Sequence, residues 1–463
     1  MERIVHLDLK GAPPKVPYLE KVLIQAKSWG ATGILLEWED TFPYTAALVD
    51  IGSQGGCGGD GMYTVEEVKY ILWLAKVNGL EPIQLVQTIG HMEYVLKHPA
   101  YRGLREAPIS PAVLCPSKPE SQVLVRAMLE QALELQPDAK YFHIGADEVW
   151  HTAVCDECKF IAATHQYKAP SLYLDHVRGI ASFVKQKRPG ITILMWDDML
   201  RSISLDTLKV YNLGELVQPV LWHYNPMECF QIDQSLWDHY RQLFPCVWAA
   251  SAFKGANGSC QILSPVCHYV SNNEAWVQEI KRYKNDVRFA GIILTGWSRY
   301  DHYATLCELL PVSLPSLASC LSVVAKCEDE TKETFVSDVL PSHQWPGEEL
   351  ARLIHSFVII RERSLSFIHG DLVTTWLNPW QIEHNYTNPA QVEAIAGTAQ
   401  MLLSEVSSLE AGLSARLSAL TGARSAAEWV CAHAAPVRAR LAALHAEAAA
   451  RAAREPALRP RPH

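Results

Sequence analysis

The stretch Tyr141-Phe142-His143-Ile144-Gly145-Ala146-Asp147-Glu148 decides the fold, because an apolar, strand-like run stops at a glycine and two adjacent acids follow. Successive side chains of a strand point to opposite faces, so neighbouring acids share a site only where the strand has ended. In a parallel α/β protein that place is the carboxyl end of the strand, where active sites lie. Paired acids there favour acid/base chemistry on a sugar bond or an acyl centre. Acids of a solvated loop or a helix N-terminus are the alternative.

Strand-like and helical patterns alternate along the first two thirds of the chain. Apolar runs predict strands at residues 4–9, 33–37, 82–86, 141–144, 192–196, 220–222, 247–250 and 292–295. Apolar residues recur at helical spacing in residues 19–29, 64–78, 122–135, 172–187, 231–242 and 274–283. This alternation predicts an α/β fold, a (β/α)₈ TIM barrel followed by a C-terminal helical region. An open doubly wound sheet is the alternative, but it usually has fewer strands, and no Gly-x-Gly-x-x-Gly turn follows these runs.

The rest of the chain predicts a second, helical region. We expect a catalytic barrel at residues 1–324, a linker at 325–345, a helical region at 346–450 and a disordered tail at 451–463. After Asn388-Pro389, a good N-cap and first-turn pair, apolar residues recur every three or four positions from Val392 to Leu420. This heptad-like stripe could form the seam of a homodimer or pack on the chain's own barrel, and both alternatives stay open.

Composition and charge bear on the partners of the chain. Hydrophobic residues make up 49% of the 463 residues and the net charge is −9, which argues against nucleic acid as a partner. We find no apolar run that reaches the roughly 18 residues of a membrane span. Met1-Glu2-Arg3 leads directly into a strand pattern, without the basic start and long apolar core of a secretion signal. We therefore expect a chain without a signal peptide.

The 12 cysteines are scattered without a regular frame, so free thiols are expected in a chain without a secretion signal. Cys155-Asp156-Glu157-Cys158 has the spacing of a metal-binding or redox pair. Zinc normally takes four ligands, and no second Cys-x-x-Cys follows. The sequence therefore predicts neither a metal nor another cofactor.

Polar and aromatic residues gather where the predicted strands end. The carboxyl ends of barrel strands meet at one face, so side chains that follow several strands line one pocket. Candidate pocket residues are Glu37 and Glu39, His91, Asp147 and Glu148, Trp196 and Asp197, Trp222 and Tyr224, and Trp297, Arg299 and Asp301.

The motif His143-x-Gly145-x-Asp147-Glu148 resembles the signature of glycoside hydrolase family 20, the β-N-acetylhexosaminidases. The similarity extends over most of residues 1–310 and includes Gly90-His91, Trp196-Asp197, Trp222 and Trp297. Segments 6–11, 37–44 and 296–303 are similar to a branch of the family that lacks signal peptides, works in the cytoplasm and nucleus, and prefers N-acetylgalactosaminides. Many family members carry an arginine at the end of strand one. Lys10-Gly11 stands there in this chain, so the family's rule for distinguishing gluco from galacto substrates is not carried over.

The resemblance implies a retaining exo-glycosidase that acts on glycoconjugates or oligosaccharides with terminal β-linked N-acetylhexosamine. In this family the 2-acetamido oxygen of the substrate attacks C1 and forms an oxazolinium intermediate, so no protein nucleophile is needed. Glu148 would be the acid and base, and Asp147 would stay ionised to accept the acetamide N–H and stabilise the positive ring.

The resemblance also implies roles for the other candidates. His91 and His143 would hold the acids, and Tyr224 would bond the acetamide carbonyl. The three tryptophans and Asp197 belong to the family's pocket, with the indole rings packed around the acetamide methyl and the sugar face. By their position after the predicted strands alone, four further residues are candidates for binding the sugar hydroxyls: Arg299, Asp301, Glu37 and Glu39.

Two other classes of protein stay open on the sequence. One is a barrel that binds sugar with little or no catalysis, which turnover of a chromogenic glycoside would exclude. The other is a metal-dependent barrel hydrolase, which resistance to a chelator would exclude. The presence of both Asp147 and Glu148 argues against the first class, and the lack of a His-x-His at strand one argues against the second.

Overall fold

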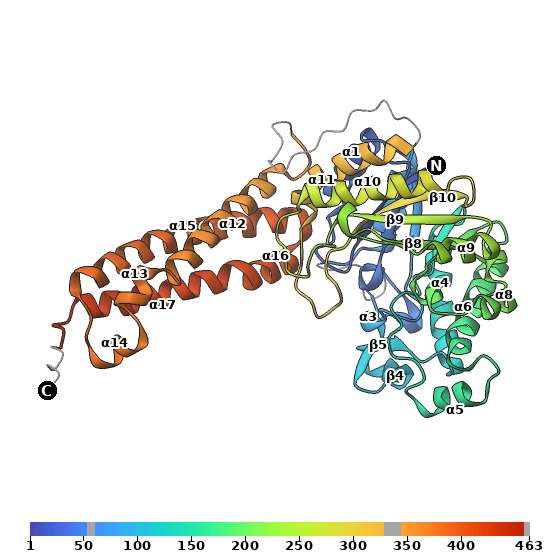
Figure 1. Ribbon diagram of the computed structural model, residues 1–463, viewed down its shortest axis with the longest axis horizontal. Coiled ribbons are helices and arrows are strands. Elements are labelled where there is room, and N and C mark those ends of the chain that lie inside the picture. The colour runs from blue at the N-terminus through green and yellow to red at the C-terminus, as the bar shows by residue number, and fades with distance from the viewer. Residues whose placement is uncertain (53–60, 328–343, 458–463) are drawn as a thin grey trace. The chain divides into compact units, whose positions relative to one another are not determined.

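The computed structural model describes residues 1–52, 61–327 and 344–457 and divides into two compact units, Met1–Pro346 and Gly347–His463 (Figure 1). In the first unit, eight parallel strands close into a barrel in the order β1-β10-β9-β8-β7-β6-β3-β2. The predicted barrel is therefore confirmed over the open sheet. The strands are β1 Glu2–Asp8, β2 Gly33–Glu37, β3 Glu81–Leu85, β6 Tyr141–His143, β7 Thr192–Trp196, β8 Val217–Trp222, β9 Val247–Lys254 and β10 Phe289–Gly296.

The first and last strands of the barrel pair with each other. Ile4 of β1 lies opposite Gly33 of β2 on one side and Ile293 of β10 on the other. Side chains that point into the barrel form an apolar core, as filled TIM barrels require. This core contains Ile4, Leu35, Ile83, Leu85, Leu194, Trp196, Val220, Trp248, Ala250 and Ile293.

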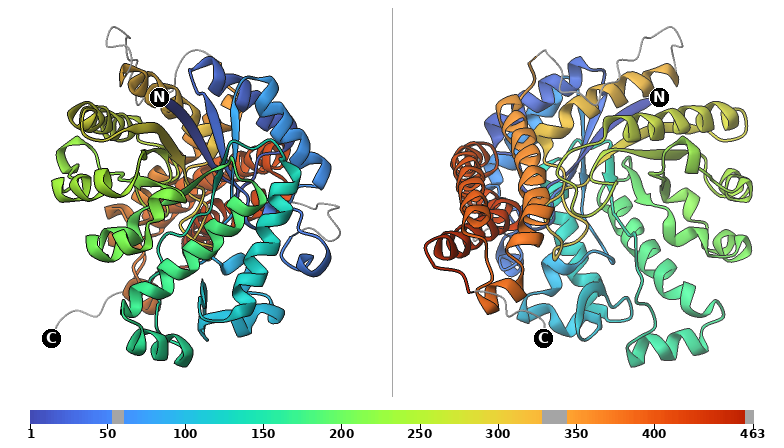
Figure 2. Two further views of the ribbon diagram at one scale, coloured as in Figure 1. Left: turned by 90° about the vertical axis from the view of Figure 1, so that its right-hand side faces the viewer. Right: turned by 60° about the vertical axis from the view of Figure 1, so that its left-hand side comes forward.

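Helices surround the barrel strands (Figure 2). Helix α2 is an example: it buries one apolar face, as the 3.6-residue period allows, and begins in a capping box formed by Thr64 and Glu67. The α-helices of this unit are α1 Val16–Ser28, α2 Val65–Val77, α3 Glu93–Leu96, α4 Pro119–Leu135, α5 Asp156–Thr164, α6 Lys168–Lys187, α7 Asp198–Arg201, α8 Leu205–Tyr211, α9 Gln234–Leu243, α10 Val266–Tyr283 and α11 Leu310–Val324. Short 3₁₀ turns lie at η1 Glu39–Thr41, η2 Ala46–Leu48, η4 Pro99–Leu104, η5 Leu213–Glu215, η6 Met227–Cys229 and η7 Ala325–Cys327.

A β-hairpin that the sequence did not predict is inserted after β3. Its strands, β4 Arg105–Ala107 and β5 Ser110–Leu114, pair antiparallel. The backbone N–H of Leu114 donates to the carbonyl oxygen of Ile89 at 2.9 Å, and Met92 donates to Ala112 at 2.9 Å. The hairpin is thereby fixed to the segment that follows β3.

The expectation that no apolar segment reaches the length of a membrane span is wrong for the segment that α11 and η7 form together. Among the described helices, the 18-residue segment Leu310–Cys327 has a mean hydropathy of 1.5 and is long and apolar enough to cross a membrane. However, 67% of this segment is buried, and α11 packs against α10 and β9. This burial fits a core helix of the barrel unit.

The second unit is helical, as the sequence predicted. It contains α12 Glu348–Ile368, α13 Asp371–Trp376, α14 Pro379–His384, α15 Pro389–Thr421, α16 Ala423–Trp429, the π-helical turn η8 Val430–Ala434 and α17 Ala435–Ala452. The side chain of Asn388 accepts hydrogen bonds from the backbone of Ala390 and Gln391, so it is the N-cap that the sequence indicated.

The apolar stripe of residues 392–420 lies on α15. Its positions Val392, Ile395, Ala399, Leu402 and Val406 are buried, and α15 packs against α12 and α17 of the same unit. Neither a dimer seam nor the barrel is needed to bury these residues. A homodimer stays a prediction, and these side chains give it no support.

Parts of the predicted domain boundaries fall outside the described residues. The predicted linker at 325–345 includes residues 328–343, and the predicted disordered tail at 451–463 includes residues 458–463. Helix α17 extends to Ala452, two residues into the segment predicted as the tail.

Candidate active site

A cavity of about 210 Å³ opens at the carboxyl ends of the barrel strands. Most of the sequence-predicted residues meet there: Glu37, His91, Asp147, Glu148, Trp196, Trp222, Tyr224, Trp297 and Arg299 all line it. The sequence did not assign the remaining lining residues to the pocket, which are Lys10, Gly255, Ala256 and Tyr300. Four predicted residues do not line the cavity: Glu39, His143, Asp197 and Asp301.

The loop that carries the two acids has an unusual backbone. Gly145, Ala146 and Glu148 have φ angles of 62°, 69° and 49°, in the left-handed region that costs non-glycine residues about 1–3 kcal/mol. The hydroxyl of Tyr173 on α6 donates to the carbonyl oxygen of Ala146 at 2.8 Å. Gly145 cannot carry a side chain, because a Cβ there would lie 2.0 Å from Oε1 of Gln87. Contacts from neighbouring elements therefore hold the acids in a strained turn.

His91 lies between the two acids. Its Nε2 is 3.4 Å from Oδ2 of Asp147 and 3.3 Å from Oε2 of Glu148. Burial would lower the pKa of His91, but the charge of Asp147 and the hydrogen bonds to both carboxylates outweigh it and raise the pKa well above its ordinary value. The ring can approach so closely because Gly90 precedes it, where a Cβ would lie 2.1 Å from the carbonyl oxygen of Asp147.

The two acids differ in their surroundings. Asp147 is only 7% exposed, and its Oδ1 accepts a hydrogen bond from Nε2 of Gln87 at 3.1 Å. The same amide nitrogen donates to Oε1 of Glu37 at 3.1 Å, and the amide oxygen accepts from the backbone of Ala146 at 3.3 Å. The side chain of Glu148 is 37% exposed and faces the cavity. Asp147 is thus an enclosed, fixed acid, and Glu148 is an accessible one.

Asp198, which the sequence did not predict as a site residue, binds the backbone of Glu148. Its Oδ2 accepts from the backbone N–H of Glu148 at 2.9 Å, and its Oδ1 accepts from Nε1 of Trp222 at 3.3 Å. Burial and the nearby charge of Asp147 raise the pKa of Asp198 to about 7. The predicted residue Asp197 is fully buried beside Asp198, and it binds Arg201 at 2.6 Å and the hydroxyl of Tyr240 at 2.8 Å.

Aromatic rings form the floor and one wall of the cavity. Trp196 is buried at the floor, with its ring centroid 5.9 Å from that of Trp297. Trp222 and Tyr224 stack at 5.3 Å, and Nε1 of Trp297 donates to the hydroxyl oxygen of Tyr224 at 3.3 Å. Burial raises the pKa of Tyr224, so its hydroxyl stays protonated and can donate into the cavity.

His143 does not hold the acids directly, which differs from the expectation. Its Nδ1 accepts from the backbone N–H of Gly145 at 3.0 Å, and its ring packs under Trp196 at 4.5 Å. Burial lowers the pKa of His143 to about 3, so the ring is neutral. His143 therefore supports the turn and the floor, because the end of a strand points it into the barrel interior.

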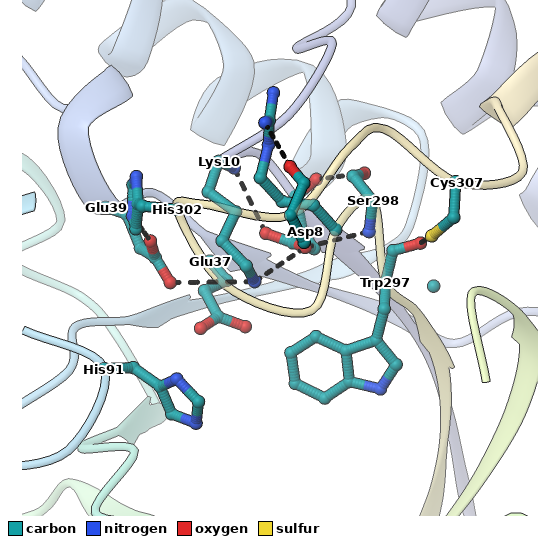
Figure 3. Close-up of polar contacts among 12 residues, drawn as sticks. Asp8, Lys10, Glu37, Glu39, His91, Trp297, Ser298, His302 and Cys307 are labelled. Atoms are coloured by element: carbon teal, nitrogen blue, oxygen red, sulfur yellow. Dashed lines mark hydrogen bonds and ion pairs between the residues drawn. The ribbon is translucent and has the colours of Figure 1, made fainter. Parts of the chain in front are cut away.

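A charged network closes the other side of the cavity (Figure 3). Nζ of Lys10 lies 2.7 Å from Asp8, 3.8 Å from Glu39 and 5.0 Å from the ring centre of Trp297. Burial would lower the pKa of Lys10, but Asp8, Glu39 and Glu37 raise it, so the ammonium stays charged. A lysine thus supplies the positive charge at the end of strand one.

Glu37 and Glu39 both lie close to that lysine, and each has a different histidine as its partner. Glu37 accepts from Nε2 of His6 at 2.9 Å. Burial would raise the pKa of Glu37, but Lys10 and His6 outweigh it and lower the pKa. Glu39 is buried against His302, and burial and its acidic neighbours raise its pKa.

Asp301 lies away from the cavity. Its Oδ1 accepts hydrogen bonds from the backbone of Tyr303 at 2.7 Å and of Ala304 at 2.8 Å, so it stabilises a turn in the segment after β10. Arg299, two residues earlier, lines the cavity and donates to the carbonyl oxygen of Ala304 at 2.9 Å.

Known proteins are similar to this chain in sequence and in fold. The model of the glycosyl hydrolase family 20 catalytic domain matches residues 38–225. Hexosaminidase D from Homo sapiens is 39% identical over 459 residues, which cover 96% of this chain and 93% of the human protein. Hexosaminidase D from Bos taurus is 45% identical over 323 residues, or 70% of this chain and 91% of the bovine protein.

Solved structures of the family share the barrel at much lower identity. Chitobiase from Flavobacterium johnsoniae superposes with a TM-score of 0.52 at 14% identity, covering 97% of this chain and 71% of its own. This likeness shows the fold alone, whereas the identity to the two hexosaminidases over most of their length shows the family. The chain therefore belongs to glycosyl hydrolase family 20 and is a β-N-acetylhexosaminidase.

Proposed function

We propose that the enzyme is a retaining exo-glycosidase that removes terminal, non-reducing β-linked N-acetylhexosamine by substrate-assisted catalysis. The observation that carries this proposal is the contrast between the two adjacent acids. Asp147 is enclosed and held by Gln87 and His91, as a fixed anion should be. Glu148 is exposed to the cavity, where an acid can reach a leaving group and then a water molecule.

In the first step, the carbonyl oxygen of the 2-acetamido group attacks C1 as the bond from C1 to the leaving oxygen breaks. Glu148 donates its proton to that oxygen, and the sugar becomes a positively charged oxazolinium ring. Asp147 accepts the acetamide N–H and stabilises the positive charge, while the hydroxyl of Tyr224 bonds the acetamide oxygen. In the second step, Glu148 takes a proton from water, the water oxygen attacks C1, and the ring opens with the original stereochemistry.

The shape of the cavity supports removal of a terminal sugar. The floor is closed by Trp196 at the end of β7, so a glycan chain cannot continue past it. Trp222 and Trp297 present apolar ring faces on which an acetamide methyl and a sugar ring can pack. The charged groups that line the cavity near these rings, Lys10, Glu37 and Arg299, are the ones we propose for the sugar hydroxyls.

A thiazoline analogue of N-acetylhexosamine tests the substrate-assisted step, because it mimics the oxazolinium ring. Ligands that resemble high-energy states bind about 10²–10⁸-fold more tightly than substrates. We expect competitive inhibition by this compound and no cleavage of aryl glycosides that lack the 2-acetamido group. Efficient cleavage of a plain β-galactoside would overturn the mechanism.

We also propose a preference for N-acetylgalactosaminides over N-acetylglucosaminides. Its support is the similarity of segments 6–11, 37–44 and 296–303 to a galactosaminide-preferring branch of the family. The assay is kcat/KM for a matched pair of aryl glycosides that differ only at C4. A ratio above one supports the proposal, and equal or reversed values refute it.

The proposed location is the cytoplasm and the nucleus, on the same similarity. Fractionation of cells that express the full chain with a C-terminal tag would test it. We expect the enzyme in the soluble cytoplasmic and nuclear fractions. Enrichment with secretory-pathway markers would refute the proposed location.

A further inference from the structure

A second cluster of reactive side chains lies outside the cavity. Among the described residues, Glu106, Cys115, Cys155 and Cys158 form a group whose candidate ligand atoms all lie within 4.8 Å of one another. Glu106 lies on β4, Cys115 directly follows β5, and the other two cysteines flank the start of α5. The catalytic proposal uses none of the four.

The sulfur atoms have the spacing of ligands around one metal ion. Sγ of Cys115 lies 3.5 Å from Sγ of Cys155 and 3.5 Å from Sγ of Cys158. Zinc–sulfur bonds of about 2.3 Å in a tetrahedron place neighbouring sulfur atoms about 3.8 Å apart. A disulfide requires about 2.05 Å. The observed distances therefore fit an edge of a tetrahedral site better than a bonded pair.

Glu106 has a buried oxygen atom in this cluster that no N–H or hydroxyl group reaches. The residue is fully buried, and its Oε1 accepts from the backbone of Val154 at 2.6 Å and of Cys155 at 3.1 Å. Its buried Oε2 accepts no hydrogen bond from an N–H or hydroxyl group, and the other polar groups close to this carboxylate are the thiols of Cys115 and Cys158. A buried carboxylate oxygen that has only weak thiol donors beside it is costly, and a bound cation would remove that cost.

The sulfur atoms also receive hydrogen bonds typical of metal-bound thiolates. The backbone N–H of Cys158 donates to Sγ of Cys155 at 3.4 Å. The hydroxyl oxygen of Ser117 lies 2.8 Å from Sγ of Cys158 and can donate to it. Such donors around the ligands stabilise their negative charge and fix their orientation.

We propose that Glu106, Cys115, Cys155 and Cys158 bind one Zn²⁺ ion in a closed tetrahedral site. With four protein ligands, the ion has no open position for water or substrate, so the site is structural rather than catalytic. Cys155 and Cys158 supply the usual Cys-x-x-Cys half. In place of a second Cys-x-x-Cys, the fold supplies Glu106 of β4 and Cys115, which directly follows β5.

The position of the site indicates its purpose. The ion would connect the hairpin to the segment that begins with Asp147 and Glu148 and continues to Cys155. The hairpin is in turn hydrogen-bonded through Leu114 to Ile89, two residues before His91. Zinc would therefore fix, relative to each other, the two segments that carry His91 and the paired acids.

Metal analysis of the full chain, purified without added metal or chelator, tests this proposal. We expect about one zinc per chain in the wild type. Cys115→Ser and Cys158→Ser should each lose most of it, whereas Cys229→Ser, at an exposed cysteine outside the cluster, should keep it. Wild-type protein that contains no zinc and binds none when zinc is supplied, or that carries a disulfide within the cluster, would overturn the proposal.

Cobalt substitution provides a second readout if the cysteine variants fail to fold. Wild-type protein stripped of metal and loaded with Co²⁺ should show an intense thiolate-to-cobalt charge-transfer band and the visible bands of tetrahedral cobalt. Glu106→Gln keeps the three sulfur ligands and should bind zinc at least about tenfold more weakly in competition with a chromophoric chelator. A six-coordinate cobalt spectrum, or unchanged affinity in this variant, would refute the four-ligand site.

Discussion

Replacement of Asp198 by asparagine should change the stability of the enzyme in opposite directions at low and high pH. The pKa of this carboxyl lies near 7 in the folded chain, against an ordinary value of 3.8. In the window between these values, the unfolded chain has lost the proton and the folded chain keeps it. Stability contributed by the protonated carboxyl is therefore complete below about pH 4 and is lost as the pH rises towards 7.

The structure sets the magnitude of both effects. A pKa moved from 3.8 to about 7 corresponds, at about 1.4 kcal/mol for each pH unit, to about 4 kcal/mol of pH-dependent stability. Remaining solvent contact reduces this to about 2–4 kcal/mol. Asparagine has one oxygen for the two donors, Glu148 N–H and Trp222 Nε1, so it loses one hydrogen bond, worth about 1–2 kcal/mol.

Urea unfolding followed by tryptophan fluorescence, from about pH 4 to pH 8, measures the difference between the two proteins. We expect Asp198→Asn to be the less stable protein at the acidic end and to equal or exceed the wild type at the basic end. Asp238→Asn, at a partly exposed carboxylate paired with Arg241, is the control and should differ from the wild type by a small amount throughout. A difference between Asp198→Asn and wild type that does not vary with pH would refute the reasoning.

Three further substitutions test the pocket. Glu148→Gln should lower kcat by about 10²–10⁴-fold on substrates with poor leaving groups and by less on an activated phenol, and equal losses on both would remove Glu148 from the acid role. Asp147→Asn should cost about 3–4 kcal/mol of transition-state stabilisation, measured as kcat/KM, and a loss below about threefold would make it an ordinary loop carboxylate. Gly90→Ala should displace the carbonyl of Asp147, because the new Cβ would lie 2.1 Å from that oxygen, and lower kcat by about 10²-fold while circular dichroism stays unchanged. Near-normal kcat in Gly90→Ala would show that the loop can shift without harm.

The barrel strands could be located from the sequence because strands of a parallel barrel are buried on both faces and read as apolar runs. The predicted ends of these strands were less accurate where polar residues interrupt the apolar run. β8 begins at Val217 rather than residue 220, since Gln218 and Pro219 hid its start. β9 continues to Lys254 rather than ending at residue 250, because Ser251 and Lys254 are buried polar residues.

The sequence could assign to the site those residues that lie at or after the ends of barrel strands. It could not predict contacts that depend on other features of the fold. The paired acids, His91 and the three tryptophans lie at the ends of strands or in the segments that follow them, and the structure brings them to one cavity. Gln87 and Asp198 also follow strands, but their contacts with the acids depend on side-chain direction in a turn. The contacts of Cys115 and Glu106 with the two later cysteines depend on a short hairpin with no sequence pattern strong enough to reveal it.

Because β1 pairs with β10, the first and last strands of the barrel must meet before any sugar site exists. Ser298 donates to Asp8 across this seam at 2.8 Å, although 290 positions separate them in the chain. A chain still emerging from the ribosome therefore cannot capture a glycan until its final strand is free. An inhibitor that binds the pocket recognises only the closed barrel. By mass action it therefore shifts the folding equilibrium towards the closed barrel and away from every form in which β1 and β10 are apart. Such a compound should rescue variants whose defect is incomplete closure, even at positions far from the sugar.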